Sequence, residues 1–109
     1  MLVVLTSRIE YDRNNKPAAK HSLDAGAAWE NLALEGYSRS IVVHAMEGFQ
    51  PEKLRENFKI PDVYHIEIVI AIGKPAPVDT LPDKYQSIEK PKERKPLSDI
   101  LHEDEFIFN

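Results

Sequence analysis

The sequence predicts an α+β fold in which a sheet of three strands is flanked by two or three helices. Three apolar runs, at residues 2–5, 41–45 and 64–72, are rich in Val and Ile, as strands are. Between them lie two segments with helical start signals. A chain of 109 residues forms at most one domain with a small core, so we expect residues 1–109 to build a single, partial domain.

The first run is continuously apolar, which is typical of a strand buried on both faces. After a polar loop at residues 8–20, Ser22 is a plausible N-cap and Asp24 suits the first turn of a helix. We expect this helix to cover residues 25–34 and to end near Gly36. Its small residues at 25–28 fit either a tightly packed core helix or a subunit contact.

The run at residues 41–45 predicts a second buried strand that ends in a tight Glu47-Gly48 turn. Pro51 favours the first position of a short helix. Leu54 and Phe58 lie four residues apart, so both are expected to face the core. Residues 64–72 form the longest predicted strand.

Residues 74–96 contain five prolines, which predict an extended arm without regular structure. Pro96 favours the start of a short terminal helix. The apolar residues 106–108 suggest an end that docks on this subunit or on another one.

Composition excludes several classes of protein. A net charge of −4 and a pI near 5.5 argue against sequence-independent binding of nucleic acid. No apolar run is long enough for a transmembrane helix, and no signal peptide is recognisable, so we expect a cytoplasmic protein. Without cysteine, and with four scattered histidines, no metal site is expected. No Ser-His-Asp arrangement, dinucleotide fingerprint or Walker loop is present.

Two segments are candidate binding elements. At Glu47-Gly48 the missing Cβ of glycine would let the backbone meet a flat ligand, although many such glycines only make turns. The basic cluster at residues 92–95 is either a solvated charge run or a phosphate grip, in which Arg94 offers a planar fork.

Five stretches, taken in order, resemble the C-terminal half of the FMN-dependent nitroreductase family. They are residues 2–5, 23–34, 43–49, 51–61 and 70–73, and the closing Arg94-Lys-Pro-Leu-Ser-Asp-Ile100 completes the pattern. The chain departs from the family at residues 36–39, where Gly-Tyr-Ser-Arg replaces the usual Gly-Leu-Gly, and in having no counterpart of the N-terminal half.

The resemblance implies an FMN-dependent NAD(P)H oxidoreductase that reduces nitroaromatics, quinones or similar small acceptors, and it assigns no catalytic side chain. The backbone of Glu47 and Gly48 would face the flavin ring, and Lys92 and Arg94 would hold the ribityl phosphate. The complete set of implied cofactor residues is Ala45, Met46, Glu47, Gly48, Lys92 and Arg94. The resemblance further implies a homodimer with shared sites, or a second chain that supplies the missing half, and neither a nucleic-acid nor a membrane partner.

Two alternatives remain open at this point. A shortened nitroreductase-like chain would serve as a non-catalytic flavin-binding or interaction protein. A weaker alternative is a nucleotide-binding module that uses Arg94 and Lys95 without flavin.

Overall fold

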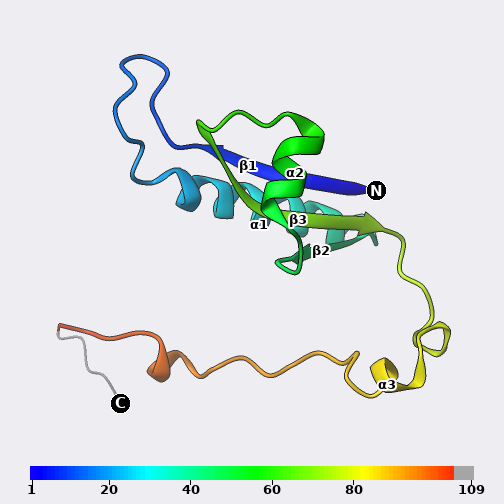
Figure 1. Ribbon diagram of the computed structural model, residues 1–109. Helices are drawn as coiled ribbons and strands as arrows, with labels where there is room; N and C mark the ends of the chain where they lie inside the picture. Colours follow the sequence, from blue (N-terminus) through cyan, green and yellow to red (C-terminus); the bar gives the residue numbers. More distant parts are fainter. Residues whose placement is uncertain (105–109) are drawn as a thin grey trace. The chain divides into compact units, whose positions relative to one another are not determined.

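The centre of the fold is a three-stranded antiparallel sheet in the order β1-β3-β2 (Figure 1). The strands are β1 (Leu2–Arg8), β2 (Val42–Met46) and β3 (Tyr64–Gly73). The computed structural model describes residues 1–104. Strand β3 pairs on both sides and carries Ile70, which is only 1% exposed. The longest apolar run of the sequence is therefore the central strand.

The expectations that residues 2–5 form a strand buried on both faces and that residues 41–45 form a second buried strand are wrong for the described chain. Strands β1 and β2 each pair only with β3 and lie at the two edges of the sheet. Leu2 is 69% exposed and Val42 is 46% exposed, because each has a strand on one side only. Apolar composition identified the strands, but it did not give their order.

Helix α1 (His21–Ser38) covers one face of the sheet and contacts β1 and β2. Its predicted end near Gly36 is confirmed, because the helix ends at Ser38, with Gly36 buried in its last turn. A Cβ on Gly36 would collide with Cγ2 of Val43 in β2, so the glycine permits close approach of helix and strand. Ser22 is not the N-cap; Lys20 takes that position and forms no side-chain cap.

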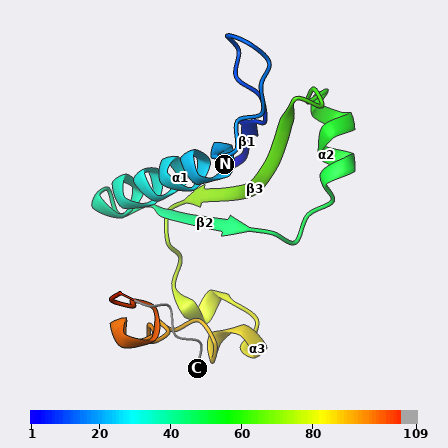
Figure 2. The same cartoon turned by 90° about the vertical axis from the view of Figure 1, so that its left-hand side faces the viewer.

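Helix α2 (Pro51–Phe58) lies on the opposite face of the sheet, as Figures 1 and 2 show from two directions. Pro51 begins it as predicted. Leu54 is half-buried, but Phe58 is 65% exposed, so the expectation that both face the core is wrong for Phe58. Arg55 secures the chain after α2 by donating to the carbonyl oxygens of Ile60, Pro61 and Tyr64 at 3.0, 2.8 and 2.9 Å.

The chain divides into two compact units, Met1–Pro75 and Ala76–Asn109, of which the first holds the sheet. The second unit contains the short helices η1 (Val78–Thr80), α3 (Asp83–Gln86) and η2 (Leu97–Asp99). The prolines of residues 74–96 thus do not prevent every regular element. Pro77, Pro82 and Pro96 each directly precede a helical turn, where their fixed φ near −55° is tolerated. The apolar residues 106–108 lie outside the described residues.

Candidate functional site

The predicted cofactor turn lies where β2 ends. Ala45 and Met46 close the strand and are half-buried, while Glu47 and Gly48 are exposed. The amide of Phe49 donates to the carbonyl oxygen of Glu47 at 2.8 Å and closes a three-residue turn centred on Gly48. Among residues 1–104 the amide of Gly48 donates to no protein acceptor, so it is available to an external one.

A cleft of about 510 Å³ opens beside this turn, between α1 and the sheet. Its size lies within the range of roughly 300–1,000 Å³ that is usual for small-molecule sites. Eight residues line it: Leu5, Ser22, Gly26, Trp29, Ala45, Glu47, Glu67 and Ile68. The indole nitrogen of Trp29 is buried and has no hydrogen-bond partner within the described residues. The walls therefore combine apolar surface with a few polar groups, as ligand sites do.

Gly48 is not required by the packing of the chain. A Cβ built on it meets no atom within 4 Å, and its φ lies outside the left-handed region. Gly36 differs, because Val43 occupies the space that its Cβ would need. The missing side chain at Gly48 leaves room on the outer side of the turn, which suits the approach of a flat ligand.

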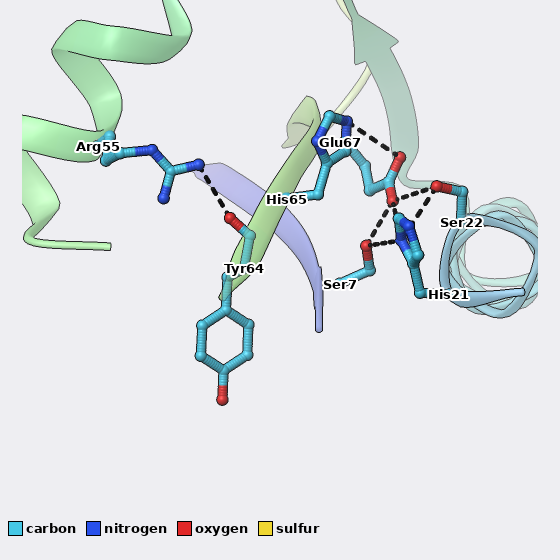
Figure 3. Close-up of polar contacts among 7 residues, drawn as sticks. All are labelled: Ser7, His21, Ser22, Arg55, Tyr64, His65 and Glu67. Carbon is cyan, nitrogen blue, oxygen red and sulfur yellow. Dashed lines mark hydrogen bonds and ion pairs between the residues drawn. The ribbon is translucent and has the colours of Figure 1, made fainter. Parts of the chain in front are cut away.

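Five polar side chains form a cluster around Glu67: Ser7, His21, Ser22, His65 and Glu67 itself (Figure 3). Of these, Ser22 and Glu67 line the cleft. One oxygen of Glu67, Oε1, accepts hydrogen bonds from the hydroxyls of Ser7 at 2.5 Å and Ser22 at 2.8 Å. Nδ1 of His21 lies 2.8 Å from the Ser7 oxygen and 3.4 Å from Oε1. Below, these five residues are called the Glu67 cluster.

A bulge in β3 places Glu67 in this cluster. Leu5 is level with Ile68 and Thr6 with Ile66, so Glu67 is an extra residue on β3 with no counterpart on β1. Such a residue interrupts the alternation of faces and redirects its side chain. Glu67 and its neighbour Ile68 consequently line the same cleft instead of opposite faces of the sheet.

The surroundings of Glu67 keep its carboxylate charged. Desolvation raises its pKa, but the hydrogen bonds from Ser7 and Ser22 and the nearby imidazoles of His65 and His21 outweigh desolvation, and the pKa is lowered overall. Both hydroxyl hydrogens are directed to the carboxylate, so the serine oxygens face His21 with lone pairs. Nδ1 of His21 must then carry the hydrogen of its contacts with these oxygens.

The Glu67 cluster contains Ser, His and Glu but is not a nucleophilic triad. In a triad the serine and the acid bond to different nitrogens of the imidazole. Here Ser7 and Glu67 both face Nδ1, and Ser7 donates its hydrogen to the carboxylate. Ser7 is also only 8% exposed, so its oxygen is not presented to a substrate. Acyl transfer at Ser7 is therefore excluded.

The predicted phosphate residues lie in the second unit. Lys92 and Arg94 are both exposed, and Nη1 of Arg94 donates to the carbonyl oxygen of Lys92 at 3.3 Å. Their assignment to a phosphate stays a prediction. Across residues 1–104 no group of three or more His, Cys, Asp or Glu is arranged to hold a metal ion. No helix in that part of the chain combines the length and apolarity of a membrane span.

Sequence reasoning did not identify the Glu67 cluster. Its members come from β1, the first turn of α1 and β3, so only the folded chain brings them together. One signal was present: Glu67 is a charged residue within an otherwise apolar stretch of β3. His44, which lies on β2 shortly before the turn, is exposed and does not line the cleft.

Comparison with known proteins gives one relative and two similar structures of note. No protein-family model matches the chain. An uncharacterised 15.4 kDa protein from the ask 5′ region of Mycolicibacterium smegmatis is 30% identical over 101 residues, which are 92% of this chain and 66% of that protein.

An oxidoreductase whose crystal structure contains FMN matches 97% of the chain, with 35% identity and a TM-score of 0.91. A nitroreductase family protein from Clostridium difficile 630 matches 96% of the chain with a TM-score of 0.68, and at 16% identity this likeness shows the fold alone. The chain spans only 55% and 59% of these two structures. The chain therefore has a nitroreductase-like fold, and it is similar to the FMN-containing oxidoreductase over about half of the length of that protein.

Proposed function

We propose that the chain is a flavin-dependent oxidoreductase of nitroreductase type that binds FMN beside the Glu47-Gly48 turn. The observation that carries the proposal is the open side of Gly48, a glycine that packing does not require and that directly follows Glu47, which lines a cleft of about 510 Å³. The similarity at 35% identity to an FMN-containing oxidoreductase supports it. When bound, FMN would supply the redox chemistry, taking hydride from NAD(P)H and passing electrons to a quinone, a nitroaromatic or a similar acceptor.

The residues of the chain would bind and orient the cofactor. Ala45 and Met46, at the end of β2, would lie beside the flavin ring, and the amide of Gly48, which has no protein acceptor within residues 1–104, would donate to a ring acceptor. Lys92 and Arg94 would hold the phosphate, where the arginine fork makes paired, charge-assisted hydrogen bonds. Glu47 contributes its backbone rather than its carboxylate.

The proposed enzyme works as a homodimer or with a chain that supplies the remaining part of the domain. The face of α1 opposite the sheet is apolar and uncovered: Leu23 and Leu34 are 69% and 59% exposed there. On the other side of the sheet, a groove of about 390 Å³ between α2 and β1 is lined almost entirely by apolar residues. Pairing would cover such surfaces. Light scattering tests this, and a concentration-independent 12.5 kDa monomer that binds FMN would contradict it.

The cofactor site is tested by comparing Gly48→Val with Gly73→Val. Gly73 ends β3, lies outside the cleft and, like Gly48, has no atom within 4 Å of a built Cβ. Both variants should keep the urea midpoint. Only Gly48→Val should weaken FMN binding, by at least about tenfold, which corresponds to about 1.4 kcal/mol. Flavin fluorescence measures this, and equal affinities for the two variants would refute the placement of FMN.

The second candidate function is a flavin-binding or interaction protein without turnover. Because the similarity covers 55% of the FMN-containing oxidoreductase, turnover is not carried over from that protein by similarity alone. Oxidation of NADPH with menadione as acceptor distinguishes the two functions. A protein that retains yellow flavin but does not oxidise NADPH would support the second function, and sustained turnover supports the first.

A further inference from the structure

Strand β1 presents an unpaired backbone edge. The terminal amine of Met1 donates to the carbonyl oxygen of Ile72 at 2.8 Å, and the amide of Ile72 donates back to the carbonyl oxygen of Met1 at 2.9 Å. In an antiparallel pair, residues that exchange hydrogen bonds in this way alternate with residues that do not. The amide and carbonyl groups of Leu2 and Val4 therefore point away from β3.

The alternation continues past the bulge. The extra residue of the bulge lies on β3, and the amide of Ile9 donates to the carbonyl oxygen of Val63 at 2.9 Å. The main-chain groups of Thr6 consequently point outward too. No described strand covers them, because β1 pairs with β3 alone. No other backbone segment of residues 1–104 bonds to the outward groups of Leu2, Val4 and Thr6.

This outer edge of β1 has none of the features that keep exposed strands apart. Natural edge strands are commonly very short, carry lysine or proline, or are distorted by a bulge of their own. Strand β1 is seven residues long, and residues 2–7 contain no charged residue and no proline. Leu2, Val4 and Thr6 also line the apolar groove of about 390 Å³ beside α2. The edge thus combines unpaired main-chain groups with apolar side chains, as a strand-pairing surface does.

We propose that β1 of a second copy pairs antiparallel with this edge and joins the two sheets into one sheet of six strands. A two-fold axis at Val4 pairs the whole uncharged run with itself. Val4 then lies opposite Val4 of the copy, and Leu2 lies opposite Thr6 of the copy. In this register each outward amide meets an outward carbonyl. Opposite side chains lie on the same face of a sheet, so Leu2 and Val4 of the copy extend the apolar floor beside α2.

Symmetry favours a second β1 over the other strands of the chain. Pairing β1 with β2 of a copy would leave one β1 and one β2 open, and assembly would continue into a filament. Two β1 strands instead give a closed, two-fold dimer. Ala45 of β2 lines the cleft, so a strand paired along β2 would lie at the cleft. The described part of the second unit, residues 76–104, contains no strand.

The first test is a disulfide at the proposed axis, in the full-length, cofactor-free protein. The chain has no cysteine, so Val4→Cys introduces the only thiol. The Cα atoms of a hydrogen-bonded antiparallel pair lie about 5.5 Å apart, which is within the range of disulfides. Mild oxidation should therefore give a covalent dimer on a non-reducing gel. The matched control is His44→Cys, on the other edge strand, which should stay monomeric on the gel although His44 is more exposed than Val4.

The second test uses charge to check the register. In the dimer Leu2 faces Thr6 of the copy twice, whereas within one chain the two positions are about 13 Å apart. Leu2→Lys combined with Thr6→Lys places like charges opposite each other, and Leu2→Lys combined with Thr6→Glu places opposite charges there. The dimer of the first double variant should dissociate at a concentration at least about tenfold higher than that of the second. Sedimentation at low salt over a concentration series measures this.

Equal cross-linking of Val4→Cys and His44→Cys would overturn the interface, and so would equal dissociation of the two double variants. A wild-type protein that stays monomeric at every concentration would overturn it as well. A dimer that forms without the Val4 cross-link would keep the proposed homodimer but reject pairing along β1. None of these outcomes depends on FMN, whose binding is decided separately by the absorption spectrum.

Discussion

Replacing Gly36 by alanine tests how closely α1 packs against β2. These two elements both contribute residues to the cleft. Gly36 is buried in the helix, and a Cβ there would overlap Cγ2 of Val43 and lie 3.4 Å from the carbonyl oxygen of Ile41. Gly26 lies in the same helix, but its Cβ would meet no atom within 4 Å. Gly26→Ala is therefore the matched control.

Both substitutions gain the higher helix propensity of alanine, but only Gly36→Ala places a methyl group in occupied space. Alanine is more stable than glycine inside a helix by about 0.8–1.0 kcal/mol, so Gly26→Ala should stabilise the protein by that amount. Inserting a methyl group into occupied space costs typically 1–3 kcal/mol. Gly36→Ala should therefore change stability by between about zero and 2 kcal/mol in the destabilising direction. In a Val43→Ala background, where the overlapping methyl is absent, Gly36→Ala should become stabilising.

Urea unfolding of the cofactor-free protein, with the midpoint and slope fitted together, measures these differences. The free energies of unfolding of Gly36→Ala and Gly26→Ala should differ by about 1–3 kcal/mol, which is the cost of overpacking. A Gly36→Ala protein that is as stabilised as Gly26→Ala would refute the close contact of α1 and β2.

Three further predictions concern other parts of the molecule. Arg55→Met should destabilise the protein by about 2–3 kcal/mol, because a cationic donor to three carbonyl oxygens is lost, while Lys53→Met on the same helix should change the urea midpoint little. Glu67→Gln should lower the free energy of unfolding at neutral pH, and its difference from wild type should shrink as pH falls through the lowered pKa of Glu67. The reason is that the stabilisation from the ionised Glu67 is complete above the unfolded-state pKa and is lost when the carboxylate is protonated. A difference in unfolding free energy that does not change with pH would contradict this. Arg94→Ala should weaken FMN binding by about 1.5–3 kcal/mol and leave riboflavin, which lacks the phosphate, almost unaffected; equal losses would reject the phosphate assignment.

Much of the fold follows from the sequence because it depends on local composition. Continuous apolar runs located all three strands, and Pro51 located the start of α2. The order of the strands could not be predicted from the sequence. An apolar run of four or five residues is compatible with an edge strand as well as with a central strand. Leu2 and Val42, which are exposed apolar residues of the two edge strands, are the examples.

The candidate site was predictable only in part. Residues 45–48 were predicted as a binding turn because a strand that runs into a glycine turn is a continuous stretch of sequence; Ala45 and Glu47 line the cleft, and their binding role stays a prediction. Ser22 was interpreted as a cap because serine at a helix start usually binds backbone amides, yet its hydroxyl reaches a carboxylate 45 residues away. Glu67 could not be assigned to a face, because a bulge shifts the register by one residue and no local pattern indicates it.

The most direct test of the central claim is the visible absorption spectrum of the purified protein after equilibration with FMN and removal of excess cofactor by gel filtration. Flavin bands should co-elute with the protein, should be strongly reduced in Gly48→Val and should be retained in Gly73→Val. A folded protein that remains colourless after this treatment, also together with any partner chain that co-purifies with it, would contradict the proposed flavin function.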